Sequence, residues 1–146
     1  MIFYNGFTVI FIYVRFIMKT AKLIIGIISI VLFGFILFQS CAAGIGNTLA
    51  GNGEVGGSAG AFLAVCMLIA GIVGIATRNG IAGGFVSGGF YTVGGLIGIA
   101  NFGSYGDLMI WSVLCFIFAV VFIAGSIMTK GHGNQPKHDP DDANGQ

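Results

Sequence analysis

The chain alternates long apolar stretches with short polar segments that hold most of its charged and turn-forming residues. Four stretches free of Asp, Glu, Lys and Arg are each long enough for the roughly 20 residues that a helix needs to cross a bilayer. Helices satisfy their own backbone groups in lipid, and the alternation typical of barrel strands is absent. We therefore expect transmembrane helices at about 21–43, 59–76, 81–100 and 108–128. The predicted fold class is all-α, a four-helix transmembrane bundle built from two hairpins.

The charged residues predict how such a bundle is oriented. If the four stretches cross a membrane, the basic residues all fall on one side of it: Arg15, Lys19, Lys22, Arg78, Lys130 and Lys137. The acidic residues between the helices, Glu54 and Asp107, fall on the other side. Because positive charge resists translocation, the pattern predicts that both ends of the membrane domain, 18–129, face the cytoplasm. A tight turn at 77–80 then lies inside, and a Gly-rich, flexible loop over 44–60 lies outside.

The two ends of the chain differ from the membrane domain in composition. Residues 1–17 are rich in aromatic and apolar side chains, and two interpretations stay open. The segment is either an upstream extension before an independent start at Met18, or an interfacial helix with Arg15 near the lipid headgroups. If it is made, we expect it to continue as helix into the first span. Residues 130–146 hold no large apolar side chain and predict a disordered cytoplasmic tail.

Composition restricts the classes of function. Hydrophobic residues make up 56% of the chain and charged residues only 8%, so the apolar surface cannot be hidden in a water-soluble globule. A net charge of +1 with no basic cluster away from the helix ends leaves no footprint for nucleic acid. Both histidines lie in the tail, so no base stands beside a nucleophile in a span. We therefore expect no enzyme activity, no catalytic residue, no cofactor and no metal site.

Several glycines of the second and third predicted helices recur at spacings that place them on one helix face. These candidate helix-packing residues are Gly71, Gly74, Gly84, Gly88, Gly94 and Gly98. Glycines four residues apart form a flat stripe on which another helix backbone can approach closely. The stripe of the third helix predicts either packing inside the bundle, which is the commoner use, or self-association between copies of the chain. The glycines of the second helix are candidate partners for that stripe.

Neutral polar residues within or at the ends of the predicted spans suggest a second kind of site. They are Gln39, Ser87, Tyr91, Thr92 and Asn101. If these side chains faced one another across the bundle, they would line a neutral polar path for a small solute. The predicted spans hold no Asp or Glu that would mark an ion or proton path.

The features from Met18 to Lys130 follow a recognisable order. A basic start leads into a helix that ends in the run Phe38-Gln39-Ser40-Cys41-Ala42-Ala43-Gly44, and a Gly-rich outer loop, an inner turn marked by Arg78 and a short loop over 103–107 follow. This order resembles small four-helix integral membrane proteins of Gram-positive bacteria, a class without an assigned activity. The resemblance implies location in a bacterial cytoplasmic membrane, not a mechanism. Small multidrug transporters are similar in size and span number, but they share a membrane-embedded glutamate that this chain lacks.

Three functional hypotheses follow, and all of them take the lipid bilayer as the first partner. The first is a non-enzymatic membrane protein that acts by helix–helix association, as a homo-oligomer or as an accessory subunit with a membrane-protein partner. The second is a small transporter or channel that uses the neutral polar path. The third is an immunity or envelope-stress protein that protects the membrane from a toxin.

Overall fold

Four helices account for most of the chain that the computed structural model describes, residues 2–130. They are α1 (Ile2–Ala50), α2 (Gly56–Ala76), α3 (Ile81–Ala100) and α4 (Gly106–Lys130). The described residues contain no strand, which confirms the predicted all-α class. The predicted tail lies outside the described residues apart from Lys130, which ends α4.

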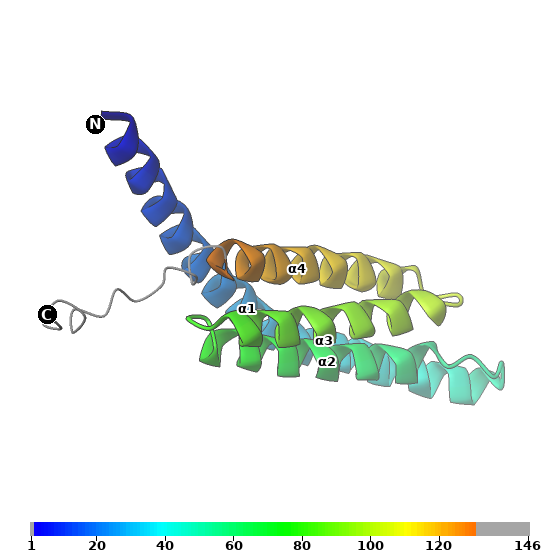
Figure 1. The fold of residues 1–146 in the computed structure, drawn as a ribbon. Coiled ribbons are helices and arrows are strands. Elements are labelled where there is room, and N and C mark those ends of the chain that lie inside the picture. The colour runs from blue at the N-terminus through cyan, green and yellow to red at the C-terminus, as the bar shows by residue number, and fades with distance from the viewer. Residues whose placement is uncertain (1, 131–146) are drawn as a thin grey trace, which may run out of the picture.

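Each of the four helices is long and apolar enough to cross a membrane, so the chain is a multi-pass membrane protein. At about 1.5 Å per residue, α2, α3 and α4 measure roughly 30 to 38 Å, close to the thickness of the hydrocarbon core. Helix α1 has 49 residues and measures about 73 Å, roughly two and a half times that thickness. The length difference explains why the N-terminal part of α1 projects beyond the end of the bundle (Figure 1).

Neighbouring helices in the sequence are neighbours in space. Helix α1 packs along α2, α2 along α3 and α3 along α4, whereas α4 meets α1 and α2 over much shorter stretches. The helices run side by side and reverse direction at each short connection, so two hairpins form one bundle (Figure 1). As a result, the α1–α2 and α3–α4 connections share one end of the bundle, and the α2–α3 turn lies at the other.

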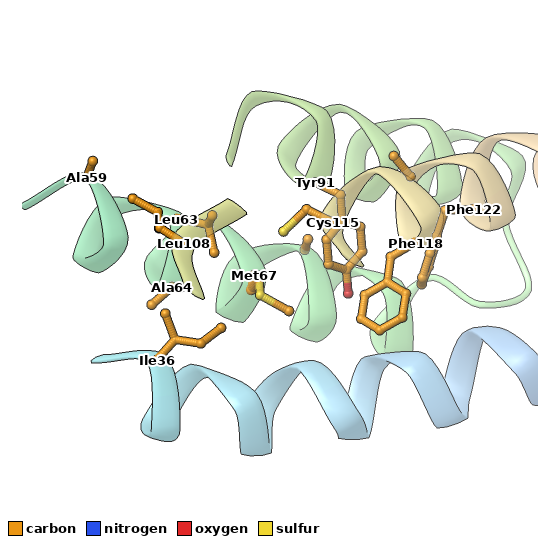
Figure 2. Close-up of a cluster of buried hydrophobic side chains, with 12 residues drawn as sticks. Ile36, Ala59, Leu63, Ala64, Met67, Tyr91, Leu108, Cys115, Phe118 and Phe122 are labelled. Carbon is orange, nitrogen blue, oxygen red and sulfur yellow. The ribbon is translucent and has the colours of Figure 1, made fainter. Parts of the chain in front are cut away.

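The core of the bundle is built mainly from α2 and α4. Its buried residues are Ile36 from α1, Ala59, Leu63, Ala64, Met67 and Ala70 from α2, Tyr91 from α3, and Leu108, Cys115, Phe118, Ala119 and Phe122 from α4. Figure 2 shows Tyr91 beside Phe118 and Phe122 in this cluster. The Tyr91 ring centroid lies 5.5 Å from each of the two phenylalanine rings. Aromatic rings therefore fill the part of the interior that lies between α3 and α4.

The α1–α2 connection is much shorter than the sequence suggests. The predicted flexible loop over 44–60 is wrong, because α1 continues to Ala50 and α2 begins at Gly56. The five residues between them turn through Gly51 and Gly53, whose φ angles of 61° and 70° lie in the left-handed region that favours glycine. The other glycines of the predicted loop lie in α1 or α2, and Gly44 and Gly57 bring the two helical backbones into contact.

The N-terminal segment is helical and continuous with α1, with no break between Ile2 and the first span. Many large apolar side chains on it are exposed, with Phe7 at 72% and Phe16 at 71% of their surface. This arrangement agrees with the expected continuation of the helix. An apolar helical surface of this kind is stable beside lipid and unstable in water.

Candidate functional site

Glycines of α3 bring its backbone against α4. A Cβ placed on Gly88 would lie 2.6 Å from a side chain of α4, and one on Gly98 would overlap the side chain of Ser112. A Cβ on Gly84 would likewise overlap Ser126. At these three positions the stripe is therefore filled by the chain's own fourth helix, and no second copy is needed to cover it.

The nearest contacts of the other predicted packing glycines lie on three different helices, α1, α2 and α4. A Cβ on Gly94 would lie 3.0 Å from Cys66 of α2, and one on Gly74 would lie 2.5 Å from a ring of α4. Gly71 faces α1, where its Cβ would lie 3.0 Å from the carbonyl oxygen of Gly26. Gly74 thus borders α3 and α4, whereas Gly71 packs on α1 and not on the α3 stripe.

A further glycine contact joins α1 to α2 and is absent from the sequence prediction. A Cβ on Gly57 would lie 2.5 Å from the backbone nitrogen of Gly44, and one on Gly60 would overlap the hydroxyl of Ser40. The signal is present in the sequence, because Ser40 and Gly44 are four residues apart, as in packed membrane helices. The composition of the segment over 44–60 favours a loop and hides it.

Two of the predicted polar-path residues lie deep in the bundle. Ser87 and Tyr91 are fully buried, and the Tyr91 hydroxyl lies 2.6 Å from that of Ser29 on α1. The Ser87 hydroxyl has no hydrogen-bond partner within residues 2–130. Because Phe118 and Phe122 pack against the Tyr91 ring, the Ser29–Tyr91 hydroxyl pair lies next to aromatic side chains.

The other three polar residues bond elsewhere. Thr92 and Asn101 each donate to the carbonyl oxygen four residues earlier in their helix, at 2.8 and 2.9 Å. Gln39 accepts a hydrogen bond of 3.2 Å from the indole nitrogen of Trp111. No hydrogen bond in the described chain joins any two of the five predicted residues. The structure therefore brings Ser87 and Tyr91 together on α3 but does not link the five into a continuous path.

A polar cluster closes the end of the bundle where the α1–α2 and α3–α4 connections meet. The Tyr105 hydroxyl donates to the side-chain oxygen of Asn47 at 2.6 Å, and the Asn47 amide donates to the backbone oxygen of Glu54 at 3.1 Å. Ser104 donates to a carboxylate oxygen of Glu54 at 2.6 Å. These bonds join the last turns of α1 to both connections. Asn47 escapes sequence-based detection because its segment resembles a loop.

A buried cation lies near the opposite end. Lys22 on α1 is only 3% exposed, and its ammonium group donates to the hydroxyl of Ser126 on α4 at 3.3 Å. The ammonium also lies 6.0 Å from the centroid of the Phe122 ring, within cation–π range. The sequence marks Lys22 only as a topology signal, because the burial of a side chain at a helix end depends on its neighbours in space.

Among the described residues, no group of three or more His, Cys, Asp or Glu side chains could hold a metal ion. The three cysteines are free thiols, with Cys41 exposed and Cys66 and Cys115 buried. Comparison of the chain with protein-family models, curated proteins and solved structures found no significant match.

Proposed function

We propose that this chain is an integral protein of a bacterial cytoplasmic membrane that has no catalytic site and acts by helix–helix association. It works as a homo-oligomer or as an accessory subunit of a membrane complex. The observation that carries the proposal is an apolar groove between α2 and α3. Its volume is about 290 Å³, and it is lined by Phe62, Cys66, Val86, Gly89, Phe90 and Val93.

The floor of this α2–α3 groove is open backbone. A Cβ on Gly89 would meet no atom within 4 Å, in contrast to its neighbour Gly88, which is covered by α4. Close approach of backbones through small residues is a main source of helix association in lipid. Gly89 therefore supports association through the groove, while the predicted stripe of Gly84, Gly88 and Gly98 serves the fold.

The groove is tested by filling it. Gly89→Leu places a side chain in the groove at a position where the added Cβ meets no atom within 4 Å. Crosslinked oligomers, or partners retained in mild detergent, should therefore fall at least about fivefold. The matched control is Gly34→Leu, because a Cβ on Gly34 also meets nothing within 4 Å and lies on α1. Equal association of both variants and the unmodified chain would contradict the proposal.

The transporter hypothesis receives less support. The enclosed Ser29–Tyr91 pair and the local bonds of Thr92 and Asn101 leave these groups already satisfied inside the bundle. Satisfied buried polar groups stabilise packing and offer little to a passing solute. The immunity or envelope-stress hypothesis has no side-chain arrangement that favours it, and it remains a prediction from sequence.

A further inference from the structure

Four cationic side chains meet around one small cavity at the end of the bundle where α2 turns into α3. Arg15, Lys19 and Lys22 come from α1 and Arg78 comes from the turn, and the lining is completed by Met18, Asn79 and Thr129. A topology signal requires only that positive charge stays on one side of the membrane. It does not require that charges from separate elements converge, or that one of them is buried.

The Lys22 side chain fits between α3 and α4 because Gly84 and Gly125 have no side chain there. A Cβ on Gly84 would lie 2.9 Å from the Lys22 ammonium nitrogen, and one on Gly125 would lie 3.1 Å from the adjacent carbon. An ammonium group has three donors, and Ser126 is its one hydrogen-bond partner within residues 2–130. Two donors of a side chain that is only 3% exposed are thus left for a group that the described chain does not supply.

No carboxylate of the described chain neutralises this cluster. The acidic residues between 2 and 130 are Glu54 and Asp107, and both lie at the opposite end of the bundle. A buried charge without a partner is unfavourable, and its pairing with an anion is correspondingly favourable. Any anion that pairs with this cluster must therefore come from outside the described chain.

The size and position of the cavity indicate which anion fits. Its volume is about 10 Å³, which is room for about one water-sized group. A single anionic oxygen can enter beside Lys22 while the rest of its group stays at the rim, against Arg15, Lys19 and Arg78. The cavity lies at the end of the bundle where α2 and α4 end and α3 begins, the level expected for the headgroups if these helices span a bilayer. Basic pockets between membrane helices at this depth suit phosphate-containing headgroups.

We propose that the cavity around Lys22 binds the phosphate of an anionic phospholipid headgroup. One phosphate oxygen accepts hydrogen bonds from the buried ammonium, and the remaining charge faces the guanidinium groups of Arg15 and Arg78, whose forked donors match phosphate oxygens. The acyl chains then lie against the apolar surface of the bundle. Inorganic phosphate offers the same oxygens without the chains, so the two ligands are distinguishable by experiment.

The test uses the full-length chain in nanodiscs of phosphatidylcholine, with and without phosphatidylglycerol, and counts bound phosphatidylglycerol by native mass spectrometry. Lys22→Met keeps the long side chain and removes the charge, so the fold is retained, and retention of phosphatidylglycerol should fall about tenfold. The matched control is Lys130→Met, which removes a basic residue at the same end that does not line the cavity. It should cost less than about fivefold, the effect of one charge near an anionic surface.

Three results would overturn the proposal. The first is equal phosphatidylglycerol retention by Lys22→Met and the unmodified chain, with both folded by circular dichroism. The second is displacement of phosphatidylglycerol by inorganic phosphate at equal concentration, which would identify a free anion as the ligand. The third is lipid binding only after Asp139, Asp141 and Asp142 are replaced by Asn, which would make the chain's own tail the occupant.

Discussion

At the scale of single residues, most glycines of this chain allow helices to pack closely, and few of them are needed for backbone flexibility. Only Gly51, Gly53 and Gly103 among the described glycines have positive φ angles, and all three lie in the α1–α2 and α3–α4 connections. Many of the helical glycines face another helix at a distance that leaves no space for a methyl group. The exceptions, such as Gly34 and Gly89, face outward. The environment of each glycine therefore decides what a substitution does.

Gly57 is the position at which this argument is most easily tested. A Cβ there would lie 2.5 and 2.6 Å from backbone atoms of Gly44, and a backbone cannot move aside as a side-chain tip does. Gly57→Ala should therefore lower the free energy of unfolding by about 1–3 kcal/mol, the usual cost of overpacking. The measurement is reversible unfolding in mixed micelles followed by circular dichroism.

The control for that measurement is Gly34→Ala. Since a Cβ on Gly34 meets nothing within 4 Å, this change should leave stability unchanged or raise it by up to about 1 kcal/mol through helix propensity. Equal destabilisation by the two substitutions would show that the α1–α2 contact is not as close as the structure has it.

At the scale of elements, the sequence predicts the presence and type of the helices better than it predicts where each helix ends. The charge-free stretches predict four helices because a bilayer demands long apolar segments with internal hydrogen bonds, and this requirement is local. The far end of α1 depends on non-local contact. Gly44 and Asn47 belong to a segment with the composition of a loop, and they are helical because α2 and Tyr105 pack on them.

The same distinction between local and non-local causes applies to the candidate site. Spacing on α3 identifies a packing face, because residues four apart share a side of any helix. Spacing alone does not show that α4 fills Gly84 and Gly88, since several helices could pack there equally well. The burial of Lys22 also escapes detection, because it depends on glycines more than 60 residues away along the chain.

Tyr105 provides a test at this scale. Its hydroxyl joins the α3–α4 connection to Asn47 in the last turns of α1. Tyr105→Phe removes that bond and leaves the Asn47 side-chain oxygen with only the longer hydrogen bond from Asn52, at 3.4 Å. The loss should destabilise this end of α1 by about 1 kcal/mol. Amide hydrogen exchange over residues 44–50 should therefore accelerate about fivefold, while exchange in the middle of α2 stays unchanged.

The control is Tyr13→Phe, which makes the same chemical change on an exposed part of α1. It should leave exchange over residues 44–50 as it is. Acceleration of the same size in both variants, or in neither, would show that the C-terminal end of α1 does not depend on the Tyr105 contact. It would contradict our explanation of why α1 extends beyond its predicted end.

At the scale of the whole molecule, the two ends of the bundle carry opposite charge. Glu54 and Asp107 lie with the α1–α2 and α3–α4 connections, whereas Arg78 and Lys22 lie at the other end. Between the ends, the helices expose apolar side chains outward and pack through glycines and aromatic rings inward. A bilayer is the environment that accommodates such a surface, and the charge asymmetry predicts which end enters the cytoplasm.

The most direct test of this account is the accessibility of single cysteines in intact cells. Cys41→Ser removes the exposed thiol, and the buried Cys66 and Cys115 stay out of reach of a membrane-impermeant maleimide. In that background, Asn52→Cys should be labelled in intact cells, and Asn79→Cys only after the membrane is opened. Labelling of Asn79→Cys in intact cells, or equal labelling at both positions, would contradict the four-span bundle with its basic end inside.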